Sequence, residues 1–222
     1  MTKQTNILST KKLLPNQKQQ LLDANFLVIE EDFIETKIKN FELSKVNENL
    51  IFTSQNAVQS ILNHPKFEDL KSKNVFSVGM KTKDLLTENG FNVIAYTGYA
   101  SDLAEIISLV YSNETFTFFC GNLRRDILPE TLKENGIIFN EIEVYETNLT
   151  SKKITQKLDG ILFFSPSGVE SYLKSNTIKE EMCFCIGETT AEALENKKIK
   201  NITIAEKPSV ENVIAEVIEY FN

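Results

Sequence analysis

The sequence contains one histidine and no tryptophan among its 222 residues, and basic side chains are in the minority. Acidic residues outnumber basic ones by 31 to 24, which gives a formal net charge of −7. Nucleic acids are bound by clustered Lys and Arg, so this balance argues against them as partners. The lone His64 precedes Pro65 without any partner constellation. We therefore expect no histidine-dependent nucleophilic catalysis.

Cysteine is also scarce, and long apolar runs are missing. The three cysteines form no C-x-x-C pair, so the sequence offers no obvious zinc site, and we interpret all three as buried free thiols. No run approaches the roughly 20 apolar residues of a membrane helix. The N-terminus lacks the apolar core of a signal peptide. We expect a cytoplasmic protein with no metal and no membrane partner.

Short apolar runs alternate with segments of helical spacing along the chain. Continuous apolar runs are typical of strands buried on both faces. The alternation predicts an α/β fold, with parallel sheets covered by helices. Strands are predicted at 6–9, 50–53, 75–78, 92–95, 115–120, 161–164, 182–186 and 201–204.

One layout occurs twice, half a chain apart. In LIFTSQNAVQSIL (50–62) and ILFFSPSGVESYL (161–173), a buried strand ends on a serine and a helical segment starts at once. Ser165 lies 111 positions after Ser54. A single copy would indicate an ordinary strand-to-helix turn, whereas two copies indicate a duplicated site.

The duplication extends beyond this layout. VFSVGMKTKDLL aligns with CFCIGETTAEAL at an offset of 108, which matches Gly79 with Gly187 and Thr82 with Thr190. A fainter match pairs FIET with VYET. We interpret the chain as an internal duplication of about 110 residues.

The FIET and VYET segments have strand-like alternation and stand between the α/β units. We interpret them as two strands that cross between two domains, near 30–38 and 141–149. One domain is then 1–30 plus 150–222, and the other is 38–141. Two crossing strands side by side predict a hinge, and a cleft between the domains is the expected ligand site.

Small polar residues and glycines follow the predicted strands, at the turns into helices. In a parallel sheet these turns share the carboxyl edge, where helix N-termini expose unpaired N–H groups and a partial positive charge. They suit an anionic ligand, although plain helix capping would use the same residues. The predicted binding residues at these turns are Ser54, Asn56, Gly79, Thr82, Ser165, Ser167, Gly187, Thr189 and Thr190.

Two further features add charge and a phenol. Arg124 and Arg125 follow a strand, where a guanidinium can clamp a carboxylate, and we place Arg125 in the predicted binding set. The alternative for this pair is a local ion pair with Asp126 or Glu130. Tyr145 lies on the second crossing strand, where it can donate a proton or simply pack the hinge.

Several motifs in a fixed order resemble the uroporphyrinogen-III synthase family over nearly the whole chain. They are FTSQNAV, VGMKT, CGNLRRDILPETL, VYET, FFSPSGV, IGETTAEAL and EKPSVENVIAEV. The resemblance implies two flavodoxin-like α/β domains joined by a two-stranded β-ladder, with both chain termini in one domain.

The resemblance also implies a lyase reaction of haem biosynthesis. Hydroxymethylbilane, a linear tetrapyrrole with eight carboxylates, would lose water and close with ring D inverted to give uroporphyrinogen III. No cofactor is implied. Tyr145 matches the family's candidate proton donor, and Thr82 and Thr190 match threonines near its cleft. A monomer is expected, because a hinged two-domain chain needs no partner surface.

A second hypothesis uses the same fold without catalysis. A two-domain module that binds a tetrapyrrole or a small anion would need the same turns, since a fold does not fix a function. Turnover separates the two hypotheses.

Overall fold

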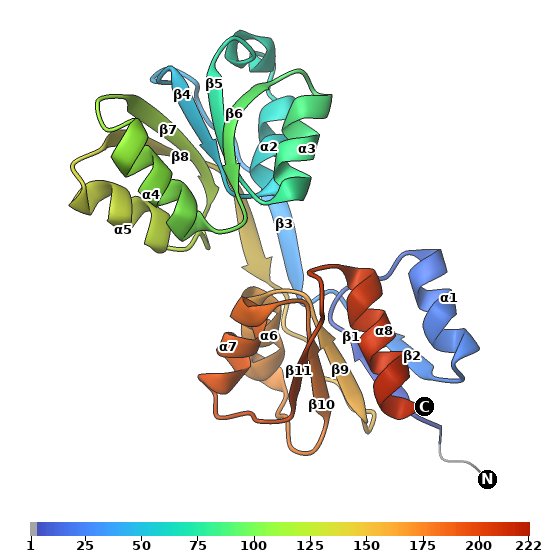
Figure 1. The fold of residues 1–222 in the computed structure, drawn as a ribbon. Helices are drawn as coiled ribbons and strands as arrows, with labels where there is room; N and C mark the ends of the chain where they lie inside the picture. Colours follow the sequence, from blue (N-terminus) through green and yellow to red (C-terminus); the bar gives the residue numbers. More distant parts are fainter. Residues whose placement is uncertain (1–3) are drawn as a thin grey trace. The chain divides into compact units, whose positions relative to one another are not determined.

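Apolar strands and amphipathic helices alternate along a computed structural model that describes residues 4–222. The chain forms two compact units (Figure 1). Unit 1 combines the chain up to Glu35 with Asn148–Asn222, and unit 2 is Thr36–Thr147. Each unit is an α/β layer structure with its own sheet.

Unit 1 has a five-stranded parallel sheet in the order β11-β10-β9-β1-β2. Helices α6 and α7 cover one face of the sheet, and α1 and α8 cover the other. Side chains of β9 alternate between the two cores, so Ile161 and Phe163 meet α6 while Leu162 meets α8. The elements are β1 (Asn6–Ser9), α1 (Pro15–Asp23), β2 (Leu27–Glu30), β9 (Gly160–Phe163), α6 (Pro166–Ser175), β10 (Met182–Cys185), α7 (Glu188–Glu195), β11 (Ile202–Ile204) and α8 (Val210–Phe221).

Unit 2 has a six-stranded sheet in the order β3-β8-β7-β4-β5-β6. Its pairs from β8 to β6 are parallel. Helices α2 and α3 pack on one face, and α4 and α5 on the other. The elements are β3 (Ile34–Ile38), β4 (Asn49–Phe52), α2 (Gln55–Leu62), a 3-10 turn (Phe67–Leu70), β5 (Asn74–Val78), α3 (Met80–Glu88), β6 (Asn92–Thr97), α4 (Ala100–Val110), β7 (Thr115–Gly121), α5 (Ile127–Glu134) and β8 (Ile138–Leu149).

The chain passes between the units within two strands that pair with each other. It leaves unit 1 within β3 and returns within β8. These strands are neighbours at the edge of the sheet of unit 2. Past the end of β8, Thr150 donates its backbone N–H to the carbonyl of Phe33 at 3.0 Å and its hydroxyl to that of Asp32 at 2.7 Å.

Both sheets use one strand order. Unit 1 reads β11-β10-β9-β1-β2, and the matching order in unit 2 is β6-β5-β4-β7-β8. In each sheet the direction of winding reverses once, between β9 and β1 in unit 1 and between β4 and β7 in unit 2. Ligands of doubly wound sheets bind at this switch point, outside the carboxyl ends of the strands.

Each of the eight strands in the sequence list is present, with bounds shifted by at most two residues. The two crossing strands are also present, but β3 starts four residues later than the predicted segment and β8 three residues earlier. The sequence list omits β2 as a separate strand. This strand lies at the edge of its sheet and is half-exposed, with Leu27 42% exposed, so it lacks a fully buried run. Its last residue, Glu30, is the first residue of the segment that the sequence assigns to the first crossing.

Candidate active site

The switch point of unit 2 brings three strand ends to one edge of the sheet. Ser54 follows β4, Gly121 ends β7, and Tyr145 lies near the end of β8. The register aligns Gly121 with Tyr145 across the β7–β8 pair. All three residues therefore stand at the carboxyl edge, where the sequence predicts ligand contacts.

Tyr145 is half-buried against the core under α2 and α3. Its phenol lies near the side chain of Ser54, which acts on the pKa of the phenol. Burial raises the pKa of the Tyr145 phenol above its ordinary value, the neighbouring Ser54 side chain lowers it, and the Cys120 thiol raises it further. The net shift is upward, so the phenol keeps its proton at neutral pH and is available as a proton donor.

Ser54 links this phenol to the start of α2. It is the N-cap residue, its backbone is extended at φ −151° and ψ 137°, and its Oγ accepts a hydrogen bond from the N–H of Asn56 at 3.1 Å. Asn56 itself is exposed. The helix N-terminus concentrates partial positive charge beside the phenol. Tyr145, Ser54 and Asn56 thus form one cluster.

The turn from β5 into α3 holds two predicted residues, Gly79 and Thr82. Gly79 has φ +85°, a conformation that favours glycine, and its N–H donates to the carbonyl of Thr97 at 2.8 Å. Its carbonyl accepts from the N–H of Thr82 at 3.1 Å. The Thr82 side chain is only 5% exposed, so it packs beneath the turn more than it projects from it.

Unit 1 places a serine pair at its own switch point. Ser165 caps α6 by accepting a hydrogen bond from the N–H of Gly168 at 3.0 Å. Its Oγ lies 3.1 Å from that of Ser167. Both serines are half-buried, and their hydroxyls share one turn after β9. This pair and the Tyr145 cluster belong to different units.

The second turn of unit 1 leads from β10 into α7. Gly187 is extended at φ 179°, a backbone conformation open to any residue, and its carbonyl accepts from the N–H of Thr190 at 3.0 Å. Thr190 is 1% exposed, whereas Thr189 is half-buried. Of the two threonines, Thr189 is the one with its side chain at the surface.

The two arginines have different surroundings. Arg124 donates from Nε to Glu141 Oε2 at 2.7 Å and pairs through its other nitrogen with Asp126, so the local ion pair predicted as the alternative with Asp126 is present. Arg125 is exposed, and no ion pair to it occurs within the part of the chain that the structure describes. A pocket of about 490 Å³ is lined by Cys120, Gly121, Asn122, Arg124, Asp126, Glu141 and Glu143.

Sequence reasoning missed two residues at these edges. Thr10 follows β1 at the switch point of unit 1, where its buried hydroxyl donates to the carbonyl of Leu162 at 2.7 Å. Gly121 lies directly against the ring of Tyr145 at the switch point of unit 2. The signal for both was their place directly after or at the end of an apolar run, in ILST and FFCG.

The cysteines are buried in the cores, and the histidine packs on an aromatic ring. All three cysteines are free and buried, as predicted, and burial raises the pKa of Cys120 to about 11 and of Cys183 and Cys185 to about 12. His64 stacks on Phe41 with ring centroids 4.9 Å apart. Among residues 4–222 no group of three or more His, Cys, Asp or Glu could hold a metal ion. No helix in this range has both the length and the apolar character to cross a membrane.

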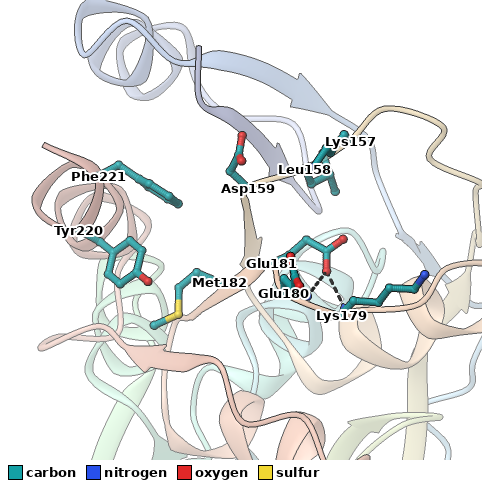
Figure 2. Close-up of a pocket in the computed structure, with 9 residues that line it drawn as sticks. All are labelled: Lys157, Leu158, Asp159, Lys179, Glu180, Glu181, Met182, Tyr220 and Phe221. Atoms are coloured by element: carbon teal, nitrogen blue, oxygen red, sulfur yellow. Dashed lines mark hydrogen bonds between the residues drawn. The ribbon is translucent and has the colours of Figure 1, made fainter. Parts of the chain in front are cut away.

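Another pocket, of about 550 Å³, lies at the opposite end of the strands in unit 1 (Figure 2). Asp159 precedes β9, Met182 begins β10, and Phe221 ends α8, so the pocket is at the amino edge of this sheet. Figure 2 shows Glu181 turned back onto the backbone N–H groups of Lys179 and Glu180, at 2.6 and 3.1 Å. None of the predicted site residues lines this pocket.

Known proteins share both the sequence pattern and the fold. The family described as uroporphyrinogen-III synthase HemD matches residues 19–215. Uroporphyrinogen-III synthase of Saccharomyces cerevisiae is 28% identical over 208 residues, which cover 78% of this chain and 75% of that protein. The crystal structure of uroporphyrinogen-III synthetase from Helicobacter pylori matches with a TM-score of 0.73 and 23% identity, over 97% of this chain and 99% of the other.

A mutant uroporphyrinogen III synthase from Thermus thermophilus has the same fold, with a TM-score of 0.71 and 13% identity, over 97% of this chain and 98% of the other. The family match covers most of the chain, and both α/β units take part in the structural matches. The chain therefore belongs to the uroporphyrinogen-III synthase family.

Proposed function

We propose that this chain cyclises hydroxymethylbilane to uroporphyrinogen III, with loss of water and inversion of ring D. Family membership over residues 19–215 supports the reaction. The observation that carries the chemistry is the half-buried phenol of Tyr145, which lies beside Ser54 at the switch point of unit 2. A protonated phenol at this edge is suited to a reaction whose leaving group is a hydroxyl.

In the proposed mechanism Asn56, Ser54 and Tyr145 act as a chain of donors. The N–H of Asn56 donates to Ser54 Oγ, which leaves the hydroxyl proton of Ser54 to turn toward the oxygen of Tyr145. The phenol proton is then directed at the substrate. Each donor in such a chain polarises the next, which makes Tyr145 a better acid than an isolated buried phenol.

Tyr145 protonates the terminal hydroxyl of the substrate as its C–O bond breaks, and water leaves. The resulting azafulvene cation is attacked by the substituted carbon of ring D, which forms a spiro intermediate. This intermediate opens at the other bond of ring D and closes again at the free carbon. The proton lost as ring D regains aromaticity balances the proton that Tyr145 supplied, so the net change is loss of one water.

Binding depends on many weak donors. The substrate carries eight carboxylates, and exposed or half-buried donors at the strand ends include Asn56, Arg125, Ser165, Ser167 and Thr189. Amides at helix N-termini bind anions without a surplus of basic residues, which reconciles the substrate with a net charge of −7. Gly79, Thr82, Gly187 and Thr190 shape the turns that present these amides.

Control of shape is the main task in this reaction. Free hydroxymethylbilane closes on its own to the isomer without inversion, so the protein must hold ring D where the substituted carbon attacks first. Positioning of this kind supplies a large part of many enzymatic accelerations. We also propose that the chain acts as a monomer in the cytoplasm, and light scattering on a size-exclusion column tests the first of these points.

An isomer assay tests the proposal. Freshly generated hydroxymethylbilane is incubated with the protein, with heat-denatured protein, and alone. The products are oxidised, and type I and type III porphyrins are separated by chromatography. We expect mostly type III with the folded protein and type I in both controls. Type I alone, formed at the spontaneous rate, would contradict the proposal and leave a binding module.

A further inference from the structure

Gly121 occupies a position where no other residue fits beside Tyr145. A Cβ built on Gly121 would lie 2.4 Å from both Cε2 and Cζ of Tyr145 and 2.9 Å from its hydroxyl oxygen. Carbon atoms that are not bonded do not approach this closely. The backbone of Gly121 is outside the left-handed region, so its conformation gives no reason for a glycine. The reason is the space that the ring occupies.

An irregularity of the sheet puts the ring over this glycine. Along β7 and β8 the register is even up to Cys120, which pairs with Glu143. It then shifts, so that Gly121 pairs with Tyr145 and Val144 is passed over. Bulges of this kind re-aim a side chain and are common next to active sites. Here the shift turns Tyr145 onto the bare Cα of Gly121.

The segment beyond Gly121 is fixed to β8 on the other side of the phenol. The side chain of Asn122 accepts from the N–H of Thr147 at 2.8 Å and donates to the carbonyl of the same residue at 3.2 Å. Backbone positions are thus set on both sides of Tyr145. The ring of Tyr145 therefore lies in a slot over Gly121, and the backbone on either side of this slot is held in place.

We propose that Gly121 is a positioning residue for the reaction, because its missing side chain leaves the space that the Tyr145 ring occupies and so fixes where the phenol hydroxyl lies, beside Ser54. Its catalytic consequence rests on the proposed function. Its structural consequence does not, because the orientation of the ring is measurable without substrate.

The clash in Gly121→Ala involves the far end of a side chain, whereas the backbone on both sides is hydrogen-bonded. The ring will therefore swing away while the sheet keeps its register. We expect a folded protein in which the phenol has left Ser54. The matched control is Gly98→Ala in the same unit, where an added Cβ meets nothing within 4 Å.

The first experiment follows the phenol itself. Tyrosine labelled with ¹³C in the ring gives up to six signals in this chain, and the signal that disappears in Tyr145→Phe assigns Tyr145. In Gly121→Ala we expect this signal to move and its titration to shift toward that of a free tyrosine, while Gly98→Ala leaves it unchanged. An unmoved signal with the original titration would overturn the proposal, whether or not the protein is a synthase.

The second experiment is a double-mutant cycle of Gly121 and Tyr145, with kcat as the measured quantity. Gly121→Ala should lower kcat about as much as Tyr145→Phe, roughly 10²-fold, with KM within about twofold. It should also raise the type I share of the product. In a Tyr145→Leu background, which empties the slot, Gly121→Ala should have no further effect on kcat. Losses that multiply independently would show that Gly121 acts apart from Tyr145 and would overturn the proposal.

If Gly121→Ala does not fold, the free energy of unfolding is measured for the other variants of the same cycle. The proposal then requires the double variant to be as stable as Tyr145→Leu alone, because the added methyl group has room once the ring is gone. A double variant that also fails to fold would place the defect in the backbone and contradict the proposal.

Discussion

The two units have the same strand order and cap the helix at the switch point with a serine, yet they differ at one strand end. In unit 1 the residue after β1 is Thr10, whose hydroxyl is turned inward onto the carbonyl of Leu162. In unit 2 the matching strand, β7, ends in Gly121, which leaves room for Tyr145. On the sequence offset of 111, these two positions are equivalent.

The difference extends to the segments FIET and VYET. Their alignment at an offset of 111 matches Ile34 with Tyr145, so the positions of unit 1 that match Tyr145 and Gly121 hold neither the phenol nor the glycine. We expect the serines of unit 1 to contribute to binding without a matching proton donor. We propose that one layout serves for binding in unit 1 and for binding plus proton transfer in unit 2. The predictions below test that division.

The largest effect is expected from Tyr145→Phe. Loss of the phenol proton should lower kcat by about 10², the lower range for a general acid, with KM little changed. The control is Tyr172→Phe in unit 1, a tyrosine that is 2% exposed and packs on Phe33 and Phe163. Steady-state rates of type III formation measure both variants. Equal rates for Tyr145→Phe and the parent would remove Tyr145 from the mechanism.

The next effect concerns stability at alkaline pH, where unit 1 should be the weaker unit. Burial raises the pKa of the Cys183 and Cys185 thiols to about 12 from 9.0, so the unfolded chain loses these protons first. Their contribution is complete below about pH 9 and declines as the pH rises toward the folded values. Between pH 8 and pH 10 the loss should be about 1 kcal/mol per thiol.

Urea unfolding at both pH values measures this loss. The pair Cys183→Ala and Cys185→Ala should remove about 2 kcal/mol of the decline, and Cys120→Ala in unit 2 about 1 kcal/mol. Each Cys→Ala substitution also leaves a cavity that lowers stability, but this cost is the same at both pH values and cancels when the two are compared within one variant. An unchanged decline in the paired variant would show that the thiols do not control alkaline stability.

A smaller contrast separates the two capping serines. Ser54→Ala and Ser165→Ala should each cost about 1 kcal/mol in the free energy of unfolding, since each removes a helix cap. Only Ser54→Ala should also lower kcat, by about tenfold, because Tyr145 loses the neighbouring hydroxyl that lowers its pKa. Ser165→Ala should act on KM. Equal effects on kcat would break the division between the units.

The pH profile sharpens this test. The side chain of Ser54 lowers the pKa of Tyr145, so its removal should raise that pKa further above the ordinary value. Activity that requires the protonated phenol falls as the pH rises through this pKa. The alkaline limb of kcat should therefore move to higher pH in Ser54→Ala, and stay in place in Ser165→Ala.

Much of the fold could be predicted from the sequence because buried parallel strands leave continuous apolar runs. The runs at β4 and β9 are fully buried, and both were predicted within one residue. The edge strand β2 was not predicted as a separate strand, because its residues are half-exposed and no turn signal separates them from the crossing segment. The internal duplication stays a prediction, which the common strand order of the two sheets favours.

The candidate site could be proposed from the sequence as a set of residue types and not as a set of contacts. Tyr145 and Ser54 were both named, but nothing local in the sequence joins residues so far apart. Gly121 was missed because a glycine at a strand end indicates an ordinary turn, and its role depends on a register shift beside Cys120. Burial of Thr82 was likewise hidden, since a hydroxyl in a helical first turn can face either way.

The smallest effect is expected for the two arginines, which both lie in unit 2 and sharpen the contrast with a unit that has none. Arg125 is exposed, so Arg125→Ala should raise KM about fivefold, equivalent to about 1 kcal/mol for one exposed charge pair. Arg124 is held by Glu141 and Asp126, so Arg124→Ala should leave KM within about twofold and instead lower stability. Measuring KM at low and high salt completes the test. Only the rise in KM of Arg125→Ala should shrink at high salt, because salt screens the exposed charge. A larger rise in KM for Arg124→Ala would mean that the ion pairs open to bind substrate, and the division between binding and structural arginines would be reversed.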